Sequence, residues 1–202
     1  MSIRSVFLAL AAVAVAAPAA LRAQENDADF VKARQQFVAG QARAAAQTLT
    51  FASAAVRQQT GRCRDADVGS RLIDAESQLD KLSASLRAGS VTSVKTLEKS
   101  LTSIDLLLAQ HHLMLALANM DRPRPNDIPV VAQDIDRGAF HYERSVTLGG
   151  GKLTTEQAAA VADVRALVKE IEETSAIPKR GVAVVTSFEK LVVGTTTVSD
   201  TR

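Results

Sequence analysis

The chain has 202 residues, of which 47% are hydrophobic, 23% charged and only 3% aromatic. Arg4 and Arg22 stand in an N-terminal segment without acids, so the chain from Gln24 onward balances 22 basic against 22 acidic residues. A neutral chain with few aromatic rings lacks both the basic surface and the stacking platforms of nucleic-acid-binding proteins, and we expect no nucleic-acid partner.

The first 23 residues have the three parts of a secretory signal peptide. Arg4 supplies the positive start, residues 6–17 form an unbroken apolar run, and a proline with small residues leads to Ala23. A membrane-spanning helix needs about 20 apolar residues, and this run is shorter. The sequence therefore predicts cleavage after Ala23, with cleavage after Ala17 or Ala19 as alternatives, and export to the periplasm or the extracellular space.

From residue 24 onward, apolar residues recur with the period of the α-helix rather than in stretches that could span a membrane. The clearest case is 65–88, where apolar residues step by four and three along one face of a helix. The same period predicts helices over 27–59, 91–119, from 127 onward after a proline-rich break, and over 155–175. Short connections make neighbouring helices antiparallel, so we predict an all-α, up-and-down bundle of five longer helices.

Two segments near the C-terminus are less regular. Residues 181–193 alternate partly like a strand, but a single strand would have no partner, and we predict a short sixth helix. Residues 195–202 are polar and are expected to form a flexible tail. The predicted organisation is a signal peptide over 1–23, a helical-bundle domain over 24–194, and this tail.

The chain has one cysteine, so it cannot form an internal disulfide. Cys63 lies between two arginines and just before a predicted helix, and both features favour the thiolate. One interpretation is a small residue packed into a turn. The other is a reactive thiol, which in an oxidising compartment would link two chains into a homodimer.

The three histidines carry the most information. His111 lies on the apolar stripe of its helix, while His112 follows Asp105 by seven residues and His141 follows Asp134 by the same spacing. If the two helices fold about position 123, His112 and Asp134 each lie 11 residues from the turn, and Asp105 and His141 each lie 18 residues from it. Each histidine is then level with an aspartate of the other helix, in two layers about 10 Å apart.

These histidine–aspartate layers have three interpretations. We rank first a set of solvated flanking charges, because exposed ion pairs are common and weak. The second is a pair of structural contacts in which each aspartate raises the pKa of its histidine, so that stability is greatest in mildly acid solution. The third is a site for a divalent transition metal built from the five residues, although a bond length near 2 Å prevents the two layers from sharing one ion. Its candidate ligands are His111, His112, His141, Asp105 and Asp134.

No sequence motif assigns an enzymatic reaction. The Gly149–Lys152 segment lacks the first glycine and the final hydroxyl of a phosphate-binding loop, and no haem-attachment motif or Glu-x-x-His pair occurs. The sequence therefore favours an exported, non-enzymatic helical-bundle protein without a cofactor, in a binding or envelope-associated structural role. The alternative is a metal- or cofactor-binding bundle that uses His111, His112 and His141.

Overall fold

The computed structural model describes residues 29–61, 63, 66–121, 123–148 and 150–200. The predicted signal peptide and its cleavage site lie outside these residues. The described part is all-α and contains no strand, which confirms the predicted fold class. Its elements are α2 (Asp29–Val38), α3 (Ala42–Thr60), α4 (Ala66–Arg87), α5 (Val94–Met120), the 3-10 turn η1 (Pro125–Asp127), α6 (Ile128–Leu148), α7 (Thr155–Thr174) and α8 (Gly181–Asp200).

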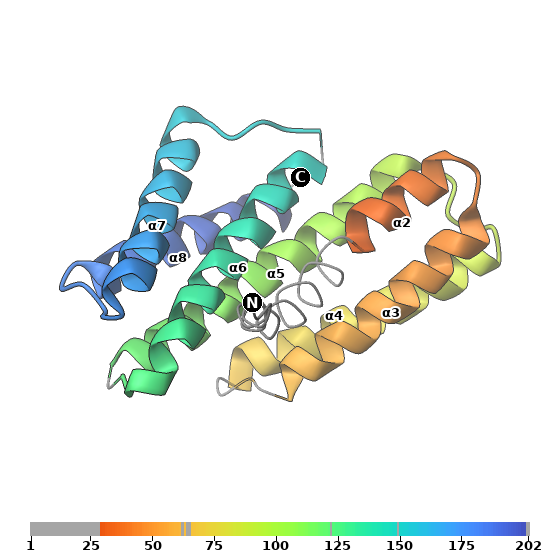
Figure 1. Ribbon diagram of the computed structural model, residues 1–202. Coiled ribbons are helices and arrows are strands. Elements are labelled where there is room, and N and C mark those ends of the chain that lie inside the picture. The colour runs from red at the N-terminus through yellow and green to blue at the C-terminus, as the bar shows by residue number, and fades with distance from the viewer. Residues whose placement is uncertain (1–28, 62, 64–65, 122, 149, 201–202) are drawn as a thin grey trace, which may run out of the picture.

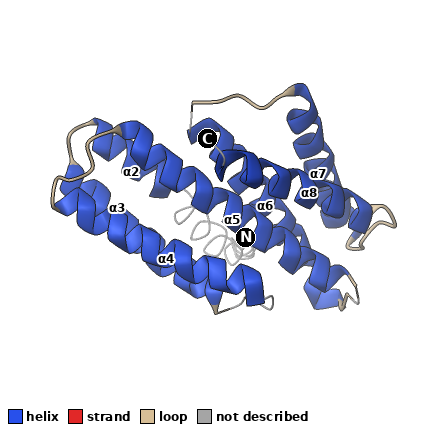
Figure 2. Ribbon diagram, turned by 180° about the vertical axis from the view of Figure 1, so that it is seen from behind, coloured by secondary structure: helices blue, strands red, loops and turns tan. Residues whose placement is uncertain are grey.

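The helices are arranged around a central antiparallel pair, α5 and α6, joined by the short proline-rich turn. The α3–α4 hairpin lies on one side of this pair, and α7 and α8 lie on the other (Figure 1). The view from behind shows the same order, with α2 folded back beside α3 and α5 (Figure 2). The bundle is therefore two outer helical layers packed on one shared inner pair.

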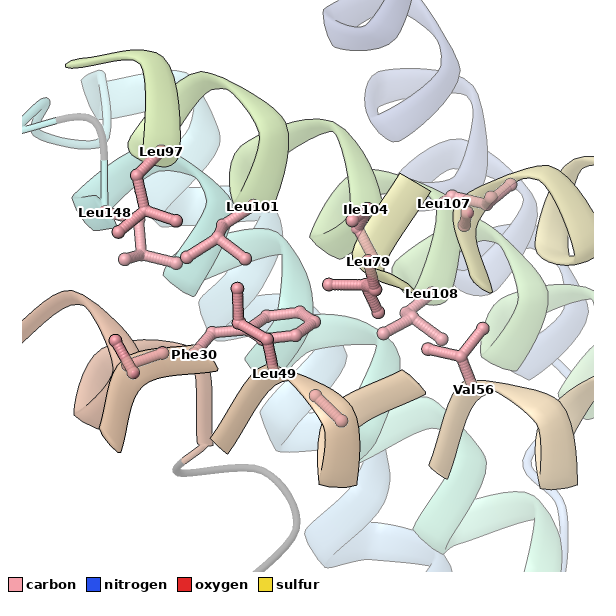
Figure 3. Packing of buried hydrophobic residues seen from close by; sticks show 14 of the residues in the cluster. Phe30, Leu49, Val56, Leu79, Leu97, Leu101, Ile104, Leu107, Leu108 and Leu148 are labelled. Carbon is pink, nitrogen blue, oxygen red and sulfur yellow. The ribbon is translucent and has the colours of Figure 1, made fainter. Parts of the chain in front are cut away.

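The helix predicted over 27–59 is in fact two helices, α2 and α3. Gly40 has a φ of +75°, a left-handed conformation that most residues avoid and that ends a helix. The backbone N–H of Gln41 donates to the carbonyl oxygen of Gln36 at 2.8 Å, which closes the turn after α2. The break lets α2 reverse direction, so that Phe30 reaches the core formed with α3 and α5 (Figure 3).

The buried apolar side chains form two clusters that meet at α5. The first joins α2, α3, α4 and the N-terminal half of α5, and Figure 3 shows Leu49, Leu79 and Leu101 within it. The second joins the C-terminal half of α5 to α6, α7 and α8. Because both clusters draw on α5, this helix is buried on several sides, unlike the one-sided helix that its apolar stripe predicts.

Among the described residues, α5 is also long and apolar enough to cross a membrane by length and composition alone. Within its most apolar window, 61% is buried inside the fold. A central helix that contacts two apolar clusters needs this composition, so the packing accounts for the hydropathy of α5.

The C-terminal helix is longer than predicted. α8 runs over 20 residues and includes 195–200, which the sequence had assigned to a flexible tail. Val185, Phe188 and Val192 are buried in the second cluster, and the Tyr142 hydroxyl lies 3.4 Å from the hydroxyl of Thr195. Packing of this face outweighs the low helix propensity of the valine- and threonine-rich sequence.

Candidate functional site

The two histidine–aspartate pairs predicted from the sequence are present. His112 Nδ1 lies 3.0 Å from Asp134 Oδ1, and His141 Nδ1 lies 3.0 Å from Asp105 Oδ1. Each pair joins α5 to α6, in opposite senses, as the equal spacing from the turn requires. A carboxylate oxygen can only accept a hydrogen bond, so His112 donates from Nδ1 to Asp134. His141 Nδ1 lies between the Asp105 carboxylate and Arg144 Nη2, which is 3.1 Å away and can only donate.

Close approach of the two helices makes these pairs possible. Gly138 lies between Asp134 and His141 on α6 and faces Leu113 of α5. A Cβ atom at this position would lie 2.8 Å from both Cγ and Cδ2 of Leu113 and 3.4 Å from the carbonyl oxygen of Ala109. The absence of a side chain at Gly138 therefore sets the helix separation at which histidine and aspartate side chains meet.

The pairs are buried, so the interpretation as solvated flanking charges is wrong. Asp105 has an exposed fraction of 0% and Asp134 of 6%, and both histidines are equally inaccessible. The reason is the central place of α5 and α6, because positions beside the apolar stripe of an inner helix face other helices rather than water. The sequence pattern located the contacts but could not show that other elements cover them.

Arg144 completes the cluster and was missed in the sequence. Its Nε donates to Asp105 Oδ2 at 2.9 Å and its Nη2 donates to Asp105 Oδ1 at 2.5 Å. The guanidinium carbon lies 4.7 Å from the ring centre of Phe30 and 5.0 Å from that of Phe140. This bidentate pair between two rings holds the guanidinium in one orientation. The signal available in the sequence was the spacing, because Arg144 follows His141 by three residues on the same helix face.

The cluster favours a neutral His112. Burial lowers the pKa of His112, and repulsion from His141 and Arg137 acts in the same direction. The hydrogen bond to Asp134 and the attraction of its carboxylate oppose this effect but do not outweigh burial. The expectation of a raised pKa for His112 is therefore wrong, because it neglected the cost of charging a buried imidazole.

His111 is also buried, and its ring centre lies 5.3 Å from that of His112. The three histidines are thus neighbours, which the sequence could only suggest. Within the described residues, however, no group of three or more histidine, cysteine, aspartate or glutamate side chains is arranged to hold a metal ion. The carboxylates of Asp105 and Asp134 instead lie within hydrogen-bond distance of His141 and His112.

Cys63 lies apart from this cluster, after the end of α3. Its side chain is half-buried and packs against the first apolar cluster. Its Sγ lies 3.8 Å from the place where a Cβ atom on Gly69 would stand. The flanking arginines 62 and 64 lie outside the described residues, and the predicted disulfide-linked homodimer stays a prediction.

A cavity of about 70 Å³ opens beside the histidine–arginine cluster, between α2 and α3 on one side and α5 and α6 on the other. We call it the inner cleft. Arg144 and Gln59 line it, and within the described residues Arg144 Nη1 and Gln59 Oε1 are buried without a hydrogen-bond partner. Among the described residues, its lining is formed by Phe30, Ala52, Ala55, Val56, Gln58, Gln59, Leu108, His112, Arg137, His141 and Arg144.

Three larger hollows lie on the surface, with volumes of about 410, 380 and 330 Å³. Their ionisable side chains, among them Lys99, Asp163 and Glu172, are exposed. The inner cleft differs because buried, hydrogen-bonded side chains form its wall, and such groups are held in place before a ligand arrives.

No known protein family, curated protein or solved structure matches this chain. The arrangement of the inner cleft is therefore the basis on which a function can be argued.

Proposed function

We propose that this protein is an exported, non-enzymatic binding protein whose binding site is the inner cleft. The proposal depends on Arg144, which is buried, paired with Asp105 and packed between two aromatic rings. It lines the cavity, and its Nη1 has no hydrogen-bond partner among the described residues. An unsatisfied buried donor is unfavourable, by about 1–3 kcal/mol, unless something occupies the site. Ligand binding would remove this cost.

The composition of the cleft also supports binding. Its described lining combines apolar side chains from α2, α3 and α5 with imidazole, guanidinium and amide groups. Small-molecule sites commonly have this combination, in which apolar surface excludes water and a few polar groups orient the ligand. These groups bind and orient well, and none of them is an activated hydroxyl or thiol nucleophile.

Export is supported by the N-terminal sequence. The apolar run over 6–17 and the small residues up to Ala23 predict a mature chain that begins at Gln24. Intact-mass measurement of the protein released from the cell envelope checks this start. A chain that keeps residues 1–23 and stays in the membrane fraction would contradict export with cleavage.

Occlusion of the cleft tests the binding function. Ala55 lines the cleft and is half-buried, whereas Ala54 is exposed on the same helix, so Ala55→Phe fills the cavity and Ala54→Phe is its matched control. Because the chain has no tryptophan, thermal unfolding is followed by far-UV circular dichroism. The probes are a panel of small carboxylates, phosphate, amines, sugars and neutral amides.

We expect at least one probe to raise the Tm of the wild type and of Ala54→Phe, but not of Ala55→Phe. A ligand that binds only the folded state stabilises it by about 2.7 kcal/mol at one hundred times its Kd, which is readily measured. A panel without any shift, or equal shifts in both variants, would refute the inner cleft as the binding site.

A further inference from the structure

We propose that the ligand of the inner cleft is a small oxyanion, with a carboxylate or a phosphate group held by Arg144 Nη1 and attracted by Arg137. The proposal rests on the binding function above and names the chemical class of its ligand. It follows from the direction of one hydrogen-bond donor, the charges on the wall and the size of the cavity.

The donor is fixed by the geometry of the guanidinium. Nε and Nη2 form one edge of this planar group, and both donate to Asp105. Nη1 is the remaining nitrogen, it is buried without a hydrogen-bond partner in the part of the chain that the structure describes, and Arg144 lines the cleft. A guanidinium N–H donates most strongly to an ionised oxygen, so a ligand oxyanion satisfies Nη1 better than a neutral group does.

The charges on the wall have one sign. Arg137 lines the cleft and forms no ion pair within the described part of the chain. No carboxylate is among the described lining residues, because Asp105 and Asp134 are turned toward Arg144 and the histidines. Arg137 therefore supplies a positive charge that a bound anion would neutralise, while a cationic ligand would be repelled.

The size of the cavity limits the ligand. A water molecule needs roughly 10–15 Å³ of such volume, so 70 Å³ holds about five waters or a solute with a similar number of non-hydrogen atoms. Acetate and inorganic phosphate both have this size. Gln59 Oε1 has no hydrogen-bond partner within the described residues, so the amide can turn its N–H group toward an anion in the cleft.

The probes of the experiment are sodium acetate and sodium phosphate, with acetamide as the neutral analogue of acetate and sodium chloride at equal ionic strength as the salt control. We expect a saturable rise in Tm with acetate or phosphate and none with acetamide or chloride. The relative affinity of the two anions distinguishes a carboxylate ligand from a phosphate ligand. No saturable rise with either anion, or an equal rise with acetamide, would overturn the proposal.

Two pairs of variants place the anion in the cleft. Gln59→Glu adds a carboxylate to the cleft wall, and Gln47→Glu adds the same charge to an exposed position of α3. Arg137→Gln removes the unpaired cation, and Arg165→Gln removes an exposed arginine of α7. We expect Gln59→Glu and Arg137→Gln to weaken anion binding at least tenfold and both controls to bind as the wild type does. Equal affinities in the test and control variants would exclude this site.

Arg144 itself is left unchanged in these variants, because its removal would leave the buried Asp105 without its partner and could unfold the chain. The neutral and cationic probes distinguish failure of the oxyanion proposal from failure of the binding function. If Ala55→Phe abolishes binding of a neutral or cationic probe and neither anion binds, the cleft is a binding site but the oxyanion proposal is wrong. If no probe of any class binds, both are wrong.

Discussion

The rings of His112 and His141 stack with centroids 5.6 Å apart and an angle of 6° between their planes, although each imidazole is bonded to an aspartate of the opposite helix. Two imidazolium ions in this arrangement would repel each other, so protonation of one ring disfavours protonation of the other. This repulsion from His141 adds to the effect of burial in lowering the pKa of His112.

The pH dependence of stability follows from the lowered pKa of His112. The unfolded state has an ordinary histidine pKa of about 6.5 and takes up a proton first as the pH falls. The contribution of His112 to the free energy of unfolding is thus complete above about pH 6.5 and is lost as the pH falls through the folded-state pKa. We expect urea unfolding, followed by circular dichroism, to show decreasing stability below neutrality.

His112→Gln removes the titrating group and serves as the reference for this effect. We expect a shallower loss of stability between neutral and mildly acid pH in this variant than in the wild type. Titration of the His112 ring signals by NMR gives the folded-state pKa directly. A value above 6.5 would mean that Asp134 outweighs burial, and identical pH profiles for the two chains would mean that the two effects cancel.

The burial of Leu79 on the α3–α4 side of the bundle predicts a large stability effect of its truncation. Leu79 is fully buried in the first apolar cluster, whereas Ile73 on the same helix is largely exposed. Leu79→Ala should reduce the free energy of unfolding by about 2–5 kcal/mol, because it removes buried methyl groups and leaves a cavity. Ile73→Ala should change it by less than about 0.5 kcal/mol. Similar losses from both, measured by urea unfolding, would be inconsistent with the burial of this face.

Much of the fold could be predicted from local patterns. The period of apolar residues in α4 gave its buried face, since Val68, Leu72 and Leu79 are all buried. Thr154 caps α7 by accepting a hydrogen bond from the backbone N–H of Gln157, three residues further along the chain. These features depend on residues close in sequence, for which spacing is sufficient information.

The predictions about burial and about the pKa of His112 failed because both depend on helices distant in sequence. The spacing of Asp105 and His141 from the turn predicted their contact. It could not show that side chains of α2 and α3 lie beside the histidine–arginine cluster, or that burial lowers the pKa of His112. Arg144 was missed for the same reason, since its role depends on Phe30 of α2. The break at Gly40, which brings Phe30 there, was hidden inside an apolar period that continues across it.

Gly138 offers a test of the close approach between α5 and α6. A methyl group at this position would lie 2.8 Å from Leu113, so Gly138→Ala should cost about 1–3 kcal/mol despite the higher helix propensity of alanine. Gly194 is the control, because a Cβ atom there meets nothing within 4 Å, and Gly194→Ala should raise stability by up to about 1 kcal/mol.

The clash also predicts coupling between the two helices. Leu113→Ala removes the carbon atoms that an alanine at 138 would meet, so the double variant should lose less stability than the sum of the two single losses. Urea unfolding of the four chains measures this coupling energy. Additive losses would show that α5 and α6 separate to accommodate the methyl group instead.

The last prediction concerns the buried charge pair of the cluster. Asp105→Asn keeps the shape of the side chain but removes the negative charge that Arg144 contacts through two nitrogens. Because an uncompensated guanidinium then remains in the protein interior, we expect a loss of about 3–5 kcal/mol. Glu143→Gln breaks the ion pair between Glu143 and Arg165, whose side chains are 27% and 51% exposed respectively. This change should reduce the free energy of unfolding by at most about 1 kcal/mol. The double variant Asp105→Asn with Arg144→Met removes both charges and should recover part of the loss. Equal small effects of Asp105→Asn and Glu143→Gln in urea unfolding would mean that water reaches Arg144. The Arg144 Nη1 atom on which the binding function rests would then be hydrated, and ligand binding would not be needed to satisfy it.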